Sequence, residues 1–204
     1  MKAFSKQLTY VIALSAATLF PVSSVLAGPR SITEFSAADN NRLDWQIVND
    51  GVMGGLSKGN VSYSDAGSMR FRGTLSLENN GGFSSVRSTD LGLNLSDQRG
   101  LVLRVRGDGR KYQLRLSTDQ RYRSSEIGFK AEFPTTEGQW NEVRVPFGKL
   151  IGSWRGRLLE DRLFDPSKIE RITILLGDKQ PGPFQLEVDW IRTYDSGSTV
   201  AQGG

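Results

Sequence analysis

The chain has 204 residues with 26 basic and 22 acidic side chains, which gives a formal charge of +4 at pH 7. It contains no cysteine, so disulfides and thiolate metal sites are excluded. It also contains no histidine, which excludes histidine-dependent catalytic triads and removes the usual zinc ligand and general base.

The first 27 residues have the layout of a secretory signal peptide. Lys2 and Lys6 precede an uncharged stretch, 7–25, that ends in the small-residue pattern Val25-Leu26-Ala27. We predict cleavage after Ala27; the alternative is a retained anchor, because the uncharged stretch is about long enough to span a bilayer. Cleavage leaves 24 basic against 22 acidic side chains, a net charge of +2, so nucleic acid is not a predicted partner. The predicted location is periplasmic or secreted.

Residues 28–195 are predicted to form a single all-β domain, because apolar and polar residues alternate with period two between glycine-rich turns. In chain order the alternating stretches are 69–77, 101–106, 112–117, 143–147, 172–176 and 184–190. About ten strands with this turn spacing are typical of a sandwich of two antiparallel sheets. The stretch 149–162 has room for one short helix, and the Gly/Ser-rich tail 196–204 is predicted to be disordered.

Two neighbouring stretches indicate a β-hairpin. Leu101, Leu103 and Val105 alternate with arginines before the turn 107–109, and the same alternation resumes in 112–117. A glycine-rich turn between two alternating runs is the usual hairpin signal. We therefore expect these two strands to pair directly.

A glycine-rich segment, 49–59, is the most unusual part of the sequence. Its spacing is not that of a phosphate-binding loop, and the residues that follow indicate a strand where such a loop needs a helix. We expect a tight connection in which the Asn49 and Asp50 side chains bond to neighbouring backbone. The alternative is that this loop contributes to a binding surface.

Several motifs together resemble the complex I intermediate-associated protein 30 family. The first is Trp45 followed by Asn49-Asp50-Gly51-Val52-Met53-Gly54-Gly55 and Ser57. The others are the segments 82–88, 101–112, 140–147 and 183–191, so the resemblance covers roughly 32–194. It implies a galactose-binding-like jelly-roll β-sandwich, a fold shared with carbohydrate-binding modules. It also implies a role like that of the named members, which are assembly chaperones for respiratory complex I; relatives in photosynthetic organisms include RNA-associated forms.

Arginines on the predicted strands allow two interpretations. Arg104, Arg106 and Arg115 would share the outward face of the hairpin, with Arg87 on another strand. They could form a basic strip that binds an acidic partner or an anionic glycan, since guanidinium groups pair bidentately with carboxylates. The other interpretation is a solvated face balanced by acidic residues such as Glu142 and Glu187.

The tryptophans suggest where a sugar could stack. Trp190 is in phase with Val188 and is predicted to be core, as is Trp45. Trp154 alone lies in a polar, glycine-flanked stretch, so it is the predicted exposed aromatic.

Carboxylates available for acid/base work are Asp50, Asp108, Asp178 and Glu187, but no spacing pairs two of them across a cleft. No calcium-loop motif is present, although Asp50 or Asp178 are conceivable ligands. We predict no enzyme activity, no metal site and no cofactor; a hydrolase is a minor alternative.

The leading hypothesis is an exported, non-catalytic binding domain that acts as an assembly factor or protein-interaction module. Its partner would be a protein, such as a respiratory or envelope complex subunit, and the domain itself is expected to be a monomer. The alternative is a carbohydrate-binding module with a glycan ligand. The predicted binding residues are Asn49, Asp50, Ser57, Arg87, Asp108, Arg115 and Trp154.

Overall fold

The computed structural model describes residues 28–36 and 43–195 of the chain. The predicted signal peptide and the predicted disordered tail lie outside these residues. Within them the regular elements are β-strands and short 3₁₀ turns, and no helix is long and apolar enough to cross a membrane.

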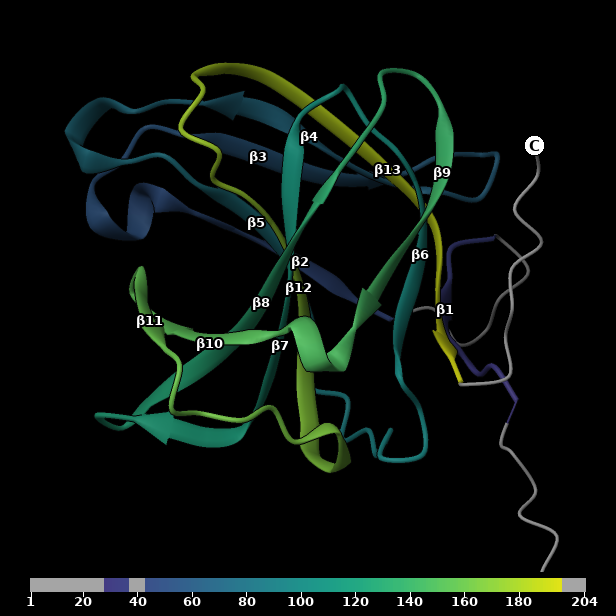
Figure 1. Cartoon of the computed structure of the whole chain (residues 1–204). Helices are drawn as coiled ribbons and strands as arrows, with labels where there is room; N and C mark the ends of the chain where they lie inside the picture. The colour runs from purple at the N-terminus through teal and green to yellow at the C-terminus, as the bar shows by residue number, and fades with distance from the viewer. Residues whose placement is uncertain (1–27, 37–42, 196–204) are drawn as a thin grey trace, which may run out of the picture.

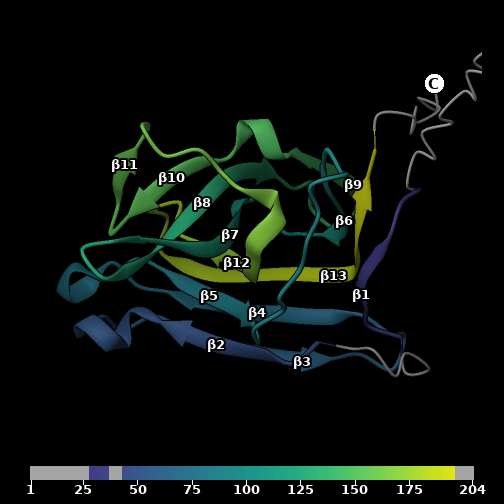
Figure 2. The same cartoon turned by 90° about the horizontal axis from the view of Figure 1, so that it is seen from below.

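Two antiparallel sheets make up the fold (Figures 1 and 2). The six-stranded sheet has the order β3-β4-β13-β6-β9, with β1 paired to β13. Its strands are β1 (Ser31–Glu34), β3 (Lys58–Tyr63), β4 (Met69–Leu75), β6 (Gly100–Arg106), β9 (Trp140–Pro146) and β13 (Gly182–Tyr194). The seven-stranded sheet has the order β11-β10-β8-β7-β12-β5-β2. Its strands are β2 (Trp45–Asn49), β5 (Ser84–Ser88), β7 (Lys111–Tyr122), β8 (Ser125–Pro134), β10 (Ile151–Trp154), β11 (Arg157–Leu159) and β12 (Ile169–Leu176).

The core lies between the sheets and is formed by the apolar half of each alternating stretch. Phe71 and Leu103 from one sheet and Leu114 and Ile174 from the other are fully buried. Each such side chain contributes about 1.5–3 kcal/mol on burial. The two-sheet jelly-roll prediction is therefore confirmed, because the inward and outward residues separate as the alternation indicates.

The predicted hairpin between 101–106 and 112–117 is wrong. β6 pairs with β13 and β9 in the six-stranded sheet, whereas β7 pairs with β12 and β8 in the other sheet. The glycine turn therefore carries the chain from one sheet to the other. Alternation shows which face of a strand is buried, and both strands satisfy it from opposite sides of the core.

The predicted basic strip is divided by this crossing. Arg104 and Arg106 lie on the six-stranded sheet, where Arg104 pairs with Asp189 and Arg106 pairs with Glu187 at 2.8 Å. Arg115 lies on the other sheet. Arg104 and Arg106 therefore belong to a solvated face that acidic residues balance, whereas Arg115 does not.

A hairpin occupies the stretch in which one short helix was expected. β10 and β11 pair with each other through a two-residue turn at Arg155-Gly156, where both residues have positive φ. Such a turn matches the twist of paired strands. β10 also pairs with β8, so these residues extend the seven-stranded sheet at one side (Figure 1).

Candidate functional site

Asp50 is a fully buried carboxylate that holds the glycine-rich segment in place. It begins the 3₁₀ turn η1 (Asp50–Met53) and accepts hydrogen bonds from the Ser57 amide at 2.9 Å and hydroxyl at 2.5 Å. It also accepts the amides of Gly82 at 2.6 Å and Phe83 at 3.2 Å. One carboxylate thus joins two loops that lie thirty residues apart in sequence.

Neighbouring groups complete this arrangement. The Asn49 side chain accepts the Gly59 amide at 3.0 Å and the Ser84 hydroxyl at 2.6 Å. A Cβ at Gly55 would lie 2.4 Å from Cγ of Asp50, so the backbone can pass this close to the carboxylate only with glycine at this position. The predicted backbone-bonding role of Asn49 and Asp50 is confirmed. With Ser57, they form a hydrogen-bonded support in which Asp50 and Ser57 are buried and Asn49 is half-buried.

Asp50 should make part of the stability depend on acid. Burial opposes its ionisation, but the hydrogen bonds from Ser57, Gly82 and Phe83 outweigh burial and hold its pKa below the ordinary 3.8. A depressed pKa gives stability that is present above pH 3.8 and is lost as pH falls through the folded-state value. We expect the stability difference between wild type and Asp50→Asn to shrink below about pH 4 in urea unfolding. A difference constant from pH 6 to pH 2.5 would contradict this assignment.

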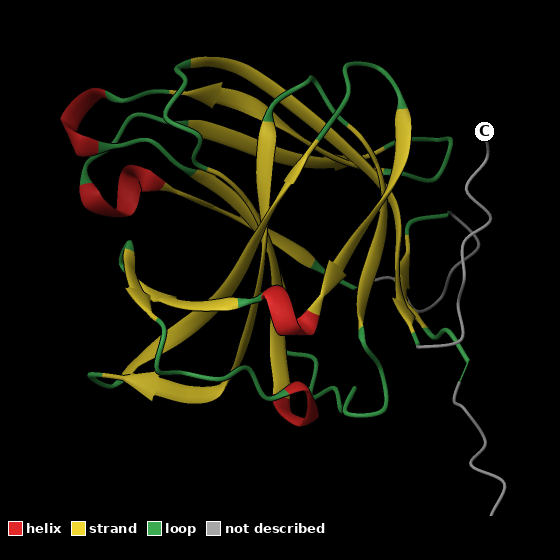
Figure 3. Ribbon diagram, viewed as in Figure 1, coloured by secondary structure: helices red, strands yellow, loops and turns green. Residues whose placement is uncertain are grey.

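The supported segment presents apolar side chains to solvent. Val52 is 75% exposed and Met53 65%, and both belong to η1. Leu56 and Leu77 are also exposed. We call these four residues the apolar tip. The Asn79 side chain of η2 (Glu78–Asn80) donates to the Gly54 carbonyl at 3.2 Å, which ties the two turns together at one end of the molecule (Figure 3).

The polar and the apolar side chains of this segment lie on different sides of it. Asn49, Asp50 and Ser57 were predicted to bind a partner. In the structure Asp50 and Ser57 are buried, Asn49 is half-buried, and all three side chains hydrogen-bond within the fold. Val52 and Met53 face outward instead. The available signal was two large apolar residues inside a glycine-rich turn, where no strand alternation requires them.

Asp108 also has a structural role. Its carboxylate accepts the Tyr112 hydroxyl at 3.1 Å, the Arg110 amide at 3.1 Å and the Gln185 amide at 2.7 Å. Burial raises the pKa of Tyr112, and the Asp108 charge raises it further. The Asp108 carboxylate thus fixes the crossing between β6 and β7 to the start of β13, and three donors already occupy it.

Arg87, Arg115 and Trp154 line one cleft on the outer face of the seven-stranded sheet, with a volume of about 420 Å³. Cross-strand register brings the arginines together, because Thr173 on β12 is opposite both Arg87 on β5 and Arg115 on β7. Residues in such a row point to the same face. The structure therefore unites three of the predicted site residues and adds Thr173, which sequence reasoning missed.

Trp154 is half-buried rather than exposed. Its ring packs against Tyr122 with centroids 5.2 Å apart, and the guanidinium groups of Arg123 and Arg155 lie over it at 5.7 Å and 5.2 Å. A sugar needs an open aromatic face, and these neighbours cover the indole. Glycan binding through Trp154 therefore stays a prediction without a contact in its favour.

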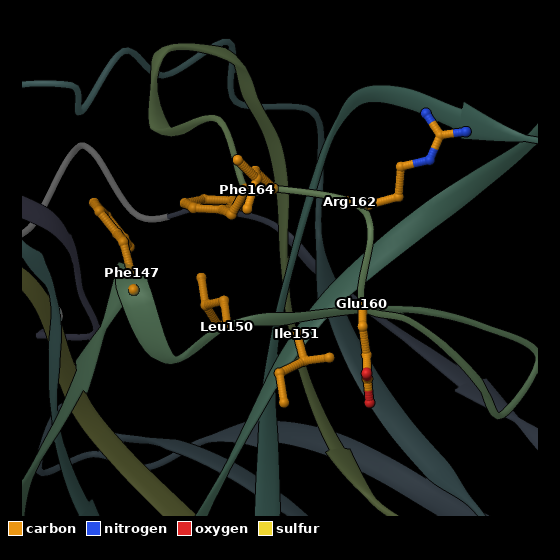
Figure 4. A pocket seen from close by; sticks show the side chains of 8 residues that line it. Phe147, Leu150, Ile151, Glu160, Arg162 and Phe164 are labelled. Atoms are coloured by element: carbon orange, nitrogen blue, oxygen red, sulfur yellow. The ribbon is translucent and has the colours of Figure 1, made fainter.

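A second hollow, of about 400 Å³, is mainly apolar (Figure 4). Phe147, Leu150 and Phe164 lie around it, and the charged groups of Glu160 and Arg162 point away from Phe147. No predicted site residue lines it. Leu163, at its rim, is 83% exposed.

The remaining carboxylate candidates are engaged in ion pairs. Asp178 binds Arg110 through two hydrogen bonds of 2.6 Å and 3.0 Å, and Glu187 binds Arg106. Burial opposes ionisation of Asp178, but the Arg110 hydrogen bond outweighs it and lowers the pKa of the carboxyl. Among residues 28–36 and 43–195, no three acidic side chains gather as metal ligands would.

Known structures share this fold. The family 11 carbohydrate-binding module of a cellulosomal cellulase from Clostridium thermocellum aligns with a TM-score of 0.63 over 83% of this chain and 95% of the module, at 12% identity. An agarase aligns with a TM-score of 0.58 over 85% of this chain and 25% of the enzyme, at 10% identity. At such low identities the likeness shows a two-sheet β-sandwich fold and does not identify a ligand.

Sequence relatives from mouse, nematode and fly carry the name of the same protein. The mouse complex I intermediate-associated protein 30, mitochondrial, is 36% identical over 99 residues, which is 46% of this chain and 30% of the relative. A Caenorhabditis elegans protein, named as the probable counterpart, is 34% identical over 107 residues, which is 49% of this chain and 30% of the relative. The Drosophila melanogaster protein of this name is 24% identical over 78% of this chain and 61% of the relative. The chain thus matches less than a third of the mouse and nematode proteins.

The predicted periplasmic or secreted location is contradicted by these relatives, which are named as mitochondrial proteins. The physical reason for the error is that a basic, acid-free leading segment is common to secretory signals and to mitochondrial transit peptides. Residues 1–27 contain Lys2 and Lys6 and no acidic residue, so their charge does not separate the two classes.

The family resemblance is confirmed over most of the chain. The model of the complex I intermediate-associated protein 30 family matches residues 33–188, which include the apolar tip, the Asp50 support and the cleft arginines. The matched region spans both sheets, from β1 to the middle of β13. The chain belongs to the complex I intermediate-associated protein 30 family.

Proposed function

We propose that this chain is a non-catalytic interaction protein that helps to assemble a respiratory complex, with the apolar tip as its main contact surface. The relatives' names support a respiratory partner and a mitochondrial setting. The observation that carries the proposal is the fixed exposure of the apolar tip. A buried carboxylate with four hydrogen bonds supports a segment whose outward side chains are apolar.

Rigid support makes the apolar tip suited to binding. Exposed apolar side chains on a mobile loop lose conformational freedom when a partner covers them, and that loss reduces affinity. Here Asp50 and Asn79 fix the backbone before contact. Burial of Val52 and Met53 by a partner would then contribute most of its hydrophobic free energy to association.

The same contacts argue against turnover. The sequence has no histidine and no cysteine, and the carboxylates Asp50, Asp108 and Asp178 each have structural donors or a guanidinium partner. A general base must be free to accept a proton from a substrate. We therefore propose that the chain binds its partner without transforming it, and that it does so as a monomer.

Replacing Val52 and Met53 by serine should weaken capture of respiratory complex I subunits by about a hundredfold or more. The loss reflects two side chains that would each contribute roughly 1.5–3 kcal/mol on burial. The measurement is a quantitative crosslinking pull-down from detergent-solubilised mitochondrial membranes, with captured subunits identified by mass spectrometry. Serine adds no charge, so a change in capture reports the loss of apolar contact area.

Leu163→Ser is the matched control, because it removes an exposed apolar side chain from a different surface. It should leave capture unchanged, and circular dichroism should show the same β-sheet spectrum for all three proteins. Equal capture by wild type and the Val52/Met53 variant would reject the apolar tip as the contact. Capture without any respiratory subunit would reject the proposed partner.

A further inference from the structure

Two arginines in the cleft form no salt bridge with any residue that the structure describes. Arg87 and Arg115 flank Thr173 across three adjacent strands, β5, β12 and β7. Neighbouring strands lie about 4.8 Å apart, so the two Cα atoms are separated by roughly 10 Å. Long side chains on one face can converge across that distance.

Local contacts do not neutralise either guanidinium. The Nε of Arg87 is buried and has no hydrogen-bond partner within 28–36 and 43–195. Arg115 donates its Nε and Nη2 to the Gln113 side-chain oxygen, at 3.1 Å and 2.8 Å, and that oxygen belongs to a neutral amide. Glu126 also lines the cleft, but its carboxylate accepts from Arg171 at 2.8 Å.

The electrostatics agree with this geometry. Burial lowers the pKa of Arg87; Glu126 opposes this effect, and the nearby Arg171 adds to it. Burial also lowers the pKa of Arg115, and the positive charge of Arg87 lowers it further. An arginine stays charged despite such shifts, so the folded chain holds two like charges that repel each other in a partly desolvated cleft.

The cleft has room and neutral donors around these charges. Gly128 faces Arg115, and even an added Cβ would lie 3.7 Å from its Cδ, so the arginine is not crowded there. The hydroxyls of Ser117 and Thr173 belong to the same cleft. Neither hydroxyl takes part in a hydrogen bond with another described side chain or backbone group.

We propose that the cleft binds an oxyanion, a carboxylate or a phosphate, between Arg87 and Arg115, with the Thr173 hydroxyl as an additional donor. Guanidinium groups present paired N–H donors that match the oxygens of either anion. Binding removes the repulsion between the arginines and gives the Arg87 Nε a partner. This site is separate from the apolar tip, so either surface can fail its test while the other stands.

The test compares thermal unfolding in sodium chloride, sodium phosphate and sodium acetate at equal ionic strength. Wild type should gain about 3–5 °C in melting temperature when phosphate or acetate reaches tenfold its Kd. The double variant Arg87→Gln with Arg115→Gln should gain nothing. The anion that produces the larger shift identifies which oxyanion fits.

A second expectation separates a ligand site from a structural one. In chloride alone the double variant should melt at or above the wild-type temperature, because it lacks the repelling charges. Arg72→Gln, at an exposed arginine on the six-stranded sheet, is the control and should keep the full anion response. A double variant that melts several degrees lower in chloride, or one that keeps the anion response, overturns the proposal.

Spectroscopy provides a readout independent of stability. The Nε–H resonance of Arg87 should move during titration with inorganic phosphate or acetate and should saturate. The arginine resonances of Arg104 and Arg106, which already have acidic partners, should not follow the same curve. An Arg87 resonance that does not move with either anion overturns the proposal.

Discussion

Asp50→Asn is expected to lower the melting temperature by about 6–12 °C. Each hydrogen bond to a charged group contributes roughly 1.5–3 kcal/mol, and the buried carboxylate accepts four. Asparagine keeps the shape and one acceptor oxygen, but its NH2 group must face either the Ser57 amide or the amides of Gly82 and Phe83, so at least one backbone donor meets another donor. We expect a net loss of about 3 kcal/mol, at roughly 2–4 °C per kcal/mol for a chain of this size.

Differential scanning calorimetry of wild type and variant measures this loss. Asp65→Asn is the control, since Asp65 is exposed and the same change there should stay within about 0.5 kcal/mol. Asp50→Asn should also bind its partner more weakly, because the apolar tip is no longer held in place. A melting temperature within 2 °C of wild type would show that the four hydrogen bonds are dispensable, and the rigid-tip argument would be wrong.

Sequence patterns predicted most of the sandwich because burial of alternate residues is a local property. Phe71, Leu114 and Ile174 are core residues in the structure, as their alternation indicates. Trp190 is the instructive exception. The pairing of β13 with β6 shifts register between Val188 and Trp190, so a bulge reverses the alternation and Ile191 is buried in place of Trp190. A bulge adds one unpaired residue and has no clear composition signal here.

The candidate site could be predicted only in part, where it depends on contacts close in the sequence. Asn49 and Asp50 accept the nearby Gly59 and Ser57 amides, as their side-chain chemistry indicates, but their bonds to Gly82, Phe83 and Ser84 come from a loop more than thirty residues away. The cleft is different, because Arg87 and Arg115 come together through β12, which follows them in the chain by more than fifty residues. Strand order and register fix that contact, and neither is readable from one sequence.

Gly73→Ala is expected to destabilise the fold by about 3 kcal/mol or to detach β3. Gly73 on β4 faces Gly59 on β3, and an added Cβ would lie 1.9 Å from the Lys58 carbonyl oxygen and 2.9 Å from the Gly59 Cα. These are backbone atoms, so no side chain can rotate away. Overpacking a core usually costs about 1–3 kcal/mol, and a rigid neighbour places this change at the upper end.

Hydrogen exchange distinguishes the two outcomes and links them to binding. If β3 detaches, the amides of 58–63 should lose protection while those of β6 and β7 keep it. β3 begins directly after Ser57, so its release should also free the apolar tip and reduce capture of respiratory subunits. Gly148→Ala is the control, because its Cβ would meet no atom within 4 Å. Unchanged stability and exchange in Gly73→Ala would mean that β3 and β4 can separate without cost, and the apolar tip would then lack the fixed base on which its binding role depends.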